Sequence, residues 1–192
     1  MKRGTRGKEP LNIEKIHDMV EYAVEDISGV SSSQVEMQSG LQFYDGMSTD
    51  EIQQILIKSA ADLISLENPN YQYVAARLLL FSLRKQVIDK LWDHPHIYDH
   101  VKKCIEKGVY DSSILDSYER KDFDRMENWI NHNRDYDFTY AGLRQVIDKY
   151  LVQDRSSGEV FETPQFMYMM ISATLFATVS YTHLTLPTKR IV

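Results

Sequence analysis

Basic side chains and one threonine stand where helices are expected to begin or end. They are Lys2, Arg3, Arg6, Lys8, Lys15, Thr49 and Lys85. Asn12 follows the basic stretch and is suited to cap a helix, whose free N–H groups and positive dipole end favour an anion. Lys15 lies one turn into that helix. The pattern indicates an anion site built from several helix ends, with a solvated basic tail as the alternative.

Four helices are expected to position these side chains. The first starts after Asn12, and the second begins at Ser31–Ser33 and ends near Gly46. The third, "STDEIQQILIKSAADLI", opens with Ser48 and Glu51 at the spacing of a capping box. The fourth is "YQYVAARLLLFSLRKQVI". Their short connections predict an α-helical bundle of about ninety residues.

Beyond this bundle, residues 93–97, "DHPHI", mark a boundary, because Pro95 interrupts any helix passing through it. Further helices are expected in "IYDHVKKCIEKG", "TYAGLRQVIDKY" and "PQFMYMMISATLFA". Between the last two, "DRSSG" separates two strand-like runs and predicts a β-hairpin. The sequence is therefore mainly α, and we divide it into residues 1–92, residues 93–178 and a last segment, 179–192.

Other reactive side chains favour structural roles. His94, His96 and His100 could bind a metal, but no cysteine partner lies close and zinc needs three or four fixed ligands, so we predict no metal site. Cys104 and the methionines of "PQFMYMMISATLFA" are interpreted as core residues. The stretch "HNRDYDFTY" is interpreted as an exposed loop anchored by its aromatic residues. No catalytic residue is predicted, because glycine-rich phosphate loops, dinucleotide fingerprints and nucleophile elbows are absent from the sequence.

The composition argues against several classes of protein. The 192 residues include 28 acidic and 22 basic ones, and the net charge of −6 argues against a general nucleic-acid binder. A single cysteine favours a reducing compartment. The sequence has no signal-peptide core and no apolar run of the roughly 18–20 residues that a membrane span needs. We therefore expect a soluble, cytoplasmic protein.

Several blocks of sequence resemble one family in their order and spacing. The first half contains "KEPLNIEKIHDMVEYA", "SSQVEM", "LQFYDGMSTDEIQQILIKSAADLIS" and "PNYQYVAARLLLFSLRK". The second half contains "YDHV", "GVYD" and "RDYDFTYAGLRQVIDKYLVQDRSSGEVFETPQFMYMMISATLFA". Together they resemble the N-terminal ATP-cone and the following helical segment of the large (α) subunit of class I ribonucleotide reductase, over roughly residues 2–178. The resemblance implies an ATP-cone four-helix bundle with a small N-terminal β-hairpin cap, followed by a partial α-helical domain with one short β-hairpin.

The resemblance also implies which residues bind an effector nucleotide. They are Lys2, Arg3, Glu9, Leu11, Asn12, Ile13, Lys15, Thr49, Gln53 and Lys85. A basic residue that contacts phosphate in the family corresponds to Lys2 or Arg3, because one extra residue around "GTRGK" leaves the register open. The family motif "E-x-x-N-x-x-K" is present as Glu9, Asn12 and Lys15.

The remaining positions lie on the third and fourth helices. Thr49 corresponds to the threonine that opens the third helix, and Gln53 stands where some members have histidine, so its amide can form hydrogen bonds but cannot become charged. Lys85 corresponds to the lysine that closes the fourth helix. The resemblance implies that Lys15, Lys85 and the basic arm neutralise the triphosphate together with Mg²⁺.

In function, the resemblance implies an allosteric switch. ATP or dATP binds the cone; ATP permits turnover, and dATP stops it by promoting an inhibited assembly of large and small (β) subunits. The family reduces ribonucleoside diphosphates with a radical relayed from the small subunit and a set of active-site cysteines. Cys104 lies outside that catalytic region, so this chain is expected to be inactive alone. The alternative is a nucleotide-independent helical module whose basic arm docks an acidic partner.

Residues 179–192, "VSYTHLTLPTKRIV", contain no acidic residue and no helical periodicity, and do not resemble the family. We interpret them as vector or adapter sequence, with a natural divergent tail as the alternative. Under either interpretation, we expect the catalytic barrel of the family to be absent from this chain. We therefore expect residues 97–178 to expose apolar surface and aggregate, and partial proteolysis to leave a core near residues 1–92.

Overall fold

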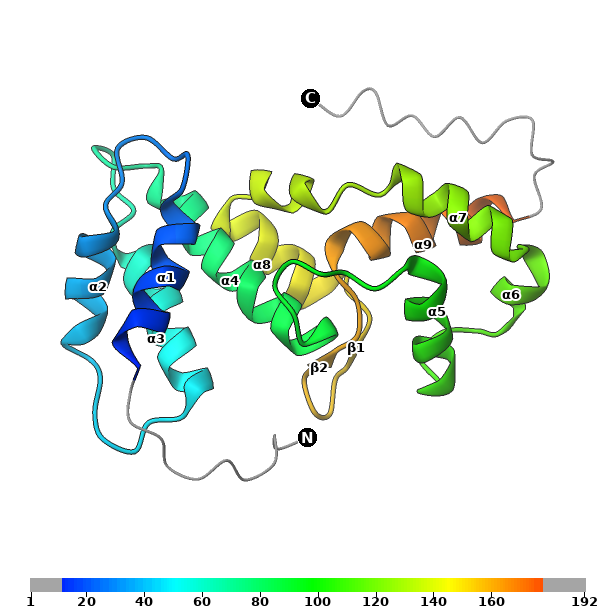
Figure 1. Ribbon diagram of the computed structural model, residues 1–192, viewed down its shortest axis with the longest axis horizontal. Coiled ribbons are helices and arrows are strands. Elements are labelled where there is room, and N and C mark those ends of the chain that lie inside the picture. Colours follow the sequence, from blue (N-terminus) through cyan, green and yellow to red (C-terminus); the bar gives the residue numbers. More distant parts are fainter. Residues whose placement is uncertain (1–11, 178–192) are drawn as a thin grey trace. The chain divides into compact units, whose positions relative to one another are not determined.

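The computed structural model describes residues 12–177, which form helices and one two-stranded hairpin (Figure 1). The helices are α1 (Ile13–Val24), α2 (Ser32–Gly40), α3 (Thr49–Asp62), α4 (Tyr71–Ile88), α5 (Ile97–Glu106), α6 (Ser113–Ser117), α7 (Arg120–Trp129), the 3-10 helix η1 (His132–Asp137), α8 (Tyr140–Lys149) and α9 (Pro164–Phe176). The strands are β1 (Gln153–Asp154) and β2 (Glu159–Val160). The mainly α prediction is confirmed, whereas the predicted N-terminal β-hairpin cap lies outside the described residues.

The described chain divides into two compact units. The first contains residues 12–82 and Tyr136–Arg144, and the second contains Leu83–Asp135 and residues 145–177. Both α4 and α8 therefore begin in the first unit and end in the second. The boundary that the sequence predicts after residue 92 stays a prediction.

The first unit is the predicted helical bundle, in which α2 contacts both α1 and α3. Its buried apolar residues come from all four helices and include Val20, Ala23, Val35, Leu56, Ile57, Ala60, Val74, Ala75 and Leu78. Figure 1 shows α1 and α3 beginning at the same end of this unit. The N-terminal ends of these two helices, where their N–H groups lack helical partners, therefore face the same side.

Two buried or half-buried side chains of α4 tie the other helices together. Arg77 donates hydrogen bonds to the carbonyls of Ala23 and Glu25, at the end of α1. The last turn of α1 contains no basic residue of its own, so Arg77 supplies the cation that complements its negative end. The hydroxyl of Tyr71 accepts from the N–H of Ser31, 3.0 Å away, and so fixes the start of α2.

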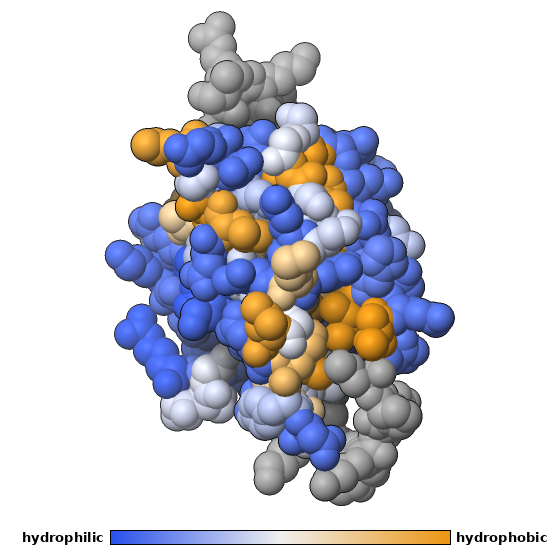
Figure 2. Space-filling model, turned by 90° about the vertical axis from the view of Figure 1, so that its left-hand side faces the viewer, coloured by the Kyte–Doolittle hydropathy of each residue, from blue (hydrophilic) through white to orange (hydrophobic). Residues whose placement is uncertain are grey.

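The second helix ends earlier than the sequence predicts, at Gly40 rather than near Gly46. It buries Val35 and Ser39, whereas Leu41 and Met37 are exposed. Figure 2 shows apolar side chains scattered over the mostly polar face of the molecule that this view presents. Gly46 instead stands in a turn with a positive φ of 88°, which a glycine adopts without strain.

The core of the second unit forms between α5, α6, α7 and α9. Its cluster consists of Ile97, Val101, Ile114, Tyr118, Phe123, Met126, Phe166, Met169, Met170 and Ala173. Pro164 occupies the first turn of α9, where its missing N–H costs no helical hydrogen bond. The interpretation of the α9 methionines as core residues is confirmed, since Met167, Met169 and Met170 are buried.

The predicted hairpin is confirmed and closed by a buried carboxyl group. Gln153 pairs with Val160 in antiparallel register. Glu162 accepts from the N–H of Val152, 2.7 Å away, and from the hydroxyl of Tyr110. This buried side chain joins both ends of the hairpin to the loop that follows α5, and its burial raises the pKa of the carboxyl.

Candidate functional site

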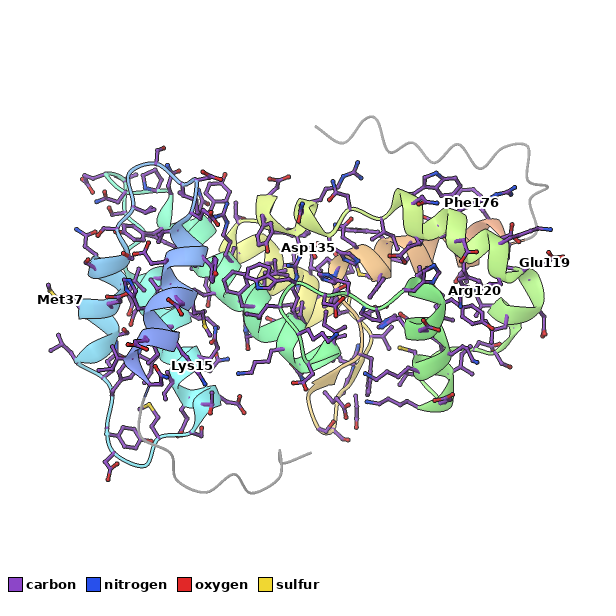
Figure 3. All side chains as sticks on the ribbon, in the orientation of Figure 1. Lys15, Met37, Glu119, Arg120, Asp135 and Phe176 are labelled. Atoms are coloured by element: carbon purple, nitrogen blue, oxygen red, sulfur yellow. The ribbon has the colours of Figure 1, made fainter. Side chains whose placement is uncertain are left out.

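The first group of site residues lies at the beginning of α1. Asn12 caps the helix, as predicted, because its side-chain oxygen accepts from the N–H of Lys15 at 3.1 Å. Ile13 and Lys15 are exposed, with Ile13 at 71% of its full accessibility. Figure 3 shows Lys15 near the start of α1. An exposed lysine beside helix N–H groups gives this end a positive potential that suits an anion.

A second group lies at the beginning of α3, where the predicted capping box is confirmed. Ser48 Oγ accepts from the N–H of Glu51, and Glu51 Oε2 accepts from the N–H of Ser48 at 2.7 Å. These hydrogen bonds lower the pKa of Glu51, whose carboxylate also accepts from the hydroxyl of Tyr44. The carboxylate of Glu51 makes the start of α3 less favourable to an anion than the start of α1. The exposed Thr49 can still donate its hydroxyl to a phosphate there.

Gln53 lies one turn after Thr49 and joins α3 to α4. Its side-chain nitrogen donates to the carbonyl of Leu78 at 2.9 Å. The bond uses one N–H and holds the half-buried side chain in place. An amide with a fixed orientation can present its oxygen or its other N–H to a sugar or phosphate.

The structure therefore places five of the ten predicted residues on the first unit, at the ends where α1 and α3 begin: Asn12, Ile13, Lys15, Thr49 and Gln53. Lys85 lies in the last turn of α4, in the part of that helix that belongs to the second unit. Its part in the site stays a prediction. Lys2, Arg3, Glu9 and Leu11 lie outside the described residues.

A buried polar network in the second unit was missed by the sequence analysis. Arg84 and Asp135 are each about 1% exposed, and Arg84 Nη2 lies 3.4 Å from Asp135 Oδ2. Burial raises the pKa of Asp135 to about 6, although Gln165 and Arg84 act in the opposite direction. The interpretation of "HNRDYDFTY" as an exposed loop was therefore wrong at Asp135. This segment forms η1, and the guanidinium that pairs with its carboxylate comes from 51 residues away.

His100 is buried in the second unit, and His94 and His132 are half-buried there. The ring of His94 stacks on that of His132, and His100 stacks on Phe166 with centroids 4.3 Å apart. Burial lowers the pKa of His94 and of His100 to about 4, and that of His132 to about 3. Within residues 12–177, no three histidine, cysteine or acidic side chains are grouped so that they could hold a metal ion.

Cys104 is a core residue, as predicted. It is 2% exposed, and its sulfur lies 3.6 Å from Nε2 of His100. Burial raises the pKa of the thiol to about 11, so the sulfur stays protonated at neutral pH. Among the described residues, no helix has the length and the hydrophobicity needed to span a bilayer.

Comparison with known proteins accounts for both halves of the chain. The family model of the ATP cone domain matches residues 2–86. The model described as "Ribonucleotide reductase, all-alpha domain" matches residues 136–185. The chain thus combines an ATP cone domain with part of the all-alpha domain of ribonucleotide reductase.

Curated relatives place this combination in one protein. The chain is 47% identical over 170 residues to the ribonucleoside-diphosphate reductase subunit alpha of Haemophilus influenzae, an alignment of 88% of this chain and 22% of the relative. It is 46% identical over 169 residues to the ribonucleoside-diphosphate reductase 1 subunit alpha of Escherichia coli, again with 88% and 22% covered. It is 42% identical to the subunit alpha of enterobacteria phage T4, over 84% of this chain and 21% of the relative.

The chain therefore belongs to the family of ribonucleotide reductase large subunits and corresponds to their N-terminal region. It spans about a fifth of the length of the curated relatives it matches. The predicted resemblance is confirmed.

Proposed function

We propose that the chain binds ATP or dATP as an allosteric effector and belongs to a ribonucleoside-diphosphate reductase large subunit. The observation that carries the proposal is the ATP-cone match over residues 2–86. The exposed Lys15 and Thr49, at helix starts that face the same side, support it. The proposed effector-binding domain comprises residues 1–92, and residues 93–178 are the beginning of the helical domain.

In the proposed complex, each group of side chains has a separate task. Lys15, Lys85 and the basic arm neutralise the triphosphate, and Mg²⁺ shares this charge. Asn12 contacts the base or sugar with the amide nitrogen, which the helix cap does not use. Glu9 contacts the same part of the nucleotide through its carboxylate. Thr49 donates its hydroxyl, and Gln53 presents an amide already oriented by Leu78.

The whole protein is proposed to reduce ribonucleoside diphosphates to deoxyribonucleotides, with a radical supplied by the small subunit. The effector would control this activity by changing how large and small subunits assemble. The described residues include a single cysteine, buried and protonated, so we expect the purified chain with a small subunit to show no nucleotide reduction. Measurable deoxyribonucleotide production would contradict this expectation.

The binding proposal is tested by isothermal titration of the 192-residue chain with ATP, dATP and GTP in the presence of Mg²⁺. We expect saturable binding of the adenine nucleotides and at least about tenfold weaker binding of GTP, which corresponds to about 1.4 kcal/mol. Binding of all three nucleotides with equal affinity would leave a phosphate site without adenine selectivity. A folded chain that binds none of them would contradict the proposal and favour a nucleotide-independent interaction module.

Substitution of single lysines assigns the site. Lys15→Ala and Lys85→Ala should each weaken ATP binding about tenfold or more, since each removes a charge-assisted contact to phosphate. Lys58→Ala is the matched control, because Lys58 is an exposed lysine of α3 that lies away from the first turn of the helix. Equal affinities for Lys15→Ala and Lys58→Ala would remove Lys15 from the site.

A further inference from the structure

The buried pair of Arg84 and Asp135 belongs to a longer chain of hydrogen bonds within the second unit. The guanidinium of Arg84 donates to the carbonyl of His132 at 2.7 Å and to that of Leu91 at 3.3 Å. Asp135 accepts on its other oxygen from the side-chain nitrogen of Gln165, 2.9 Å away. One arginine therefore holds the end of α4, the loop after it and η1, and Asp135 continues the connection to α9.

Such a network can transmit displacement because its charged members are buried away from water. Both charged side chains are buried, and a buried charge that loses its partner is costly. A shift of the turn of α4 that carries Arg84 therefore requires Asp135 to follow, or its carboxylate to lose the guanidinium. Gln165 stands in the first turn of α9, so the start of that helix is coupled to the same carboxylate. Figure 3 shows Asp135 in the interior among neighbouring side chains.

Arg84 immediately precedes Lys85, which lies in the last turn of α4. Successive helix residues point in directions about 100° apart, so Arg84 faces the interior of the second unit while Lys85 is half-buried. A ligand that draws on Lys85 acts on the same turn that carries Arg84.

We propose that Arg84, Asp135 and Gln165 form a relay by which a nucleotide phosphate bound at Lys85 changes the start of α9. The inference rests on the proposed function for its input, the nucleotide at Lys85. It adds the output, a defined helix of the reductase helical domain. Arg84 and Asp135 are positioning residues in this relay, since neither is proposed to touch the nucleotide.

Hydrogen exchange measured by mass spectrometry on the 192-residue chain, with and without ATP and Mg²⁺, tests the relay. We expect ATP to change exchange at least about threefold in peptides covering residues 132–137 and 164–170. Peptides from α5 and α7, in the same unit, serve as internal controls. They should change less, because the relay acts on its own segments, whereas general stabilisation by a bound ligand would slow exchange throughout the unit.

Two variants interrupt the relay at different points. Asp135→Asn keeps the side-chain shape and removes the charge that pairs with Arg84. Gln165→Leu leaves that ion pair intact and removes only the connection to α9, so it serves if Asp135→Asn fails to fold. Ser172→Ala is the matched control on α9, because it removes a hydrogen bond to Tyr168 that stays within the helix.

The expected result is that Gln165→Leu binds ATP with an affinity within about threefold of the wild type but loses the ATP response of residues 164–170, while Ser172→Ala keeps it. If ATP binds the wild type and residues 132–137 and 164–170 do not respond, or respond no more than α5 and α7, the relay is overturned and the proposed function stands. An unchanged response in Gln165→Leu also overturns it. If titration detects no ATP binding at all, the proposed function fails, and the relay fails with it.

Discussion

The imidazole rings of His94 and His132 lie face to face, with centroids 3.6 Å apart and ring planes 9° from parallel. His94 comes from the loop after α4 and His132 from η1, so the stack joins two segments far apart in the sequence. Partial burial, together with the nearby charge of Arg84, lowers the pKa of both rings. The pair is therefore neutral at physiological pH.

This arrangement predicts that the second unit loses stability in mild acid. Well above pH 6.5, His94, His100 and His132 are neutral in both the folded and the unfolded state. As the pH falls from 6.5 towards 4, His94, His100 and His132 become protonated in the unfolded chain but stay neutral in the folded chain. The unfolded state therefore binds more protons, and the free energy of unfolding decreases. Asp135 and Glu162 oppose this loss of stability. Burial raises the pKa of each, so both bind a proton at a higher pH in the folded chain than in the unfolded chain. Because the pKa is lowered for three histidines and raised for two acids, we expect a net decrease in the free energy of unfolding.

Thermal unfolding followed by circular dichroism at pH 7 and pH 4.5, at constant ionic strength, measures this dependence. His100→Phe keeps a ring stacked on Phe166 and removes one titrating group. It should be more stable than the wild type at pH 4.5 by on the order of 2 kcal/mol and nearly equal to it at pH 7.

The control for this experiment is His17→Gln, which removes an exposed histidine. Hydrogen bonding to Glu36 raises the pKa of His17, so its contribution to stability is present below pH 6.5 and is lost as the pH rises. The control should not become more stable in acid. An equal pH dependence for the wild type and His100→Phe would contradict the assignment to the buried cluster.

The parts of this structure that the sequence predicts are those decided by neighbouring residues. Asn12 and the pair of Ser48 and Glu51 act within one helical turn, so their spacing alone indicates the caps. The hairpin at Gly158 is local in the same way, because the positive φ of 73° there favours glycine. These elements were predicted correctly for that reason.

The parts that the sequence does not predict depend on distant partners. Asp135 lies in a stretch that is polar and aromatic, and nothing near it indicates that Arg84 will bury its charge. Gln53 was predicted to contact the nucleotide only from the resemblance to the family. Its hydrogen bond to the carbonyl of Leu78 depends on the packing of α3 against α4. The second helix was expected to end near Gly46, but α2 ends at Gly40.

Substitutions at Asn12 separate its two proposed roles. Asn12→Ala removes the cap and should lower the free energy of unfolding by about 1 kcal/mol. Asn12→Ser restores an oxygen that can accept from the N–H of Lys15 and should recover most of this loss, but it lacks the amide nitrogen proposed to contact the nucleotide. We expect the serine variant to be nearly as stable as the wild type in urea unfolding and to bind ATP more weakly. Full recovery of ATP affinity in the serine variant would limit Asn12 to a structural role.

Gln53 should contribute to both stability and binding. Gln53→Leu removes the hydrogen bond to the carbonyl of Leu78 and is expected to cost about 1 kcal/mol of stability, as well as weakening ATP binding. Gln54→Leu is the matched control, since Gln54 is the exposed neighbour on the same helix. Calorimetric titration and urea unfolding of both variants give the two quantities. A Gln53→Leu variant with wild-type ATP affinity would show that the amide serves only to join the helices.

Tyr136 should determine where the first unit ends. It lies far along the chain, yet its ring belongs to the first unit, with the ring of Phe81 edge-on at 6.5 Å and the guanidinium carbon of Arg77 at 5.4 Å. Aromatic and cation–π contacts of this kind contribute about 1–2 kcal/mol together. Tyr136→Ala should therefore lower the unfolding temperature of the first unit. Tyr150→Ala, at a tyrosine 59% exposed, should leave it unchanged.

The same contacts bear on the domain boundary after residue 92. A fragment of residues 1–92 lacks Tyr136, so we expect it to fold and to unfold at a lower temperature than the first unit of the whole chain. Limited proteolysis of the whole chain gives an independent measure, because a segment held against α4 resists cleavage. If residues 136–144 stabilise the first unit, the protected core should include them. A protected core that ends near residue 92 and melts like the whole chain would show instead that the bundle is complete without Tyr136, and would support the boundary predicted from the sequence.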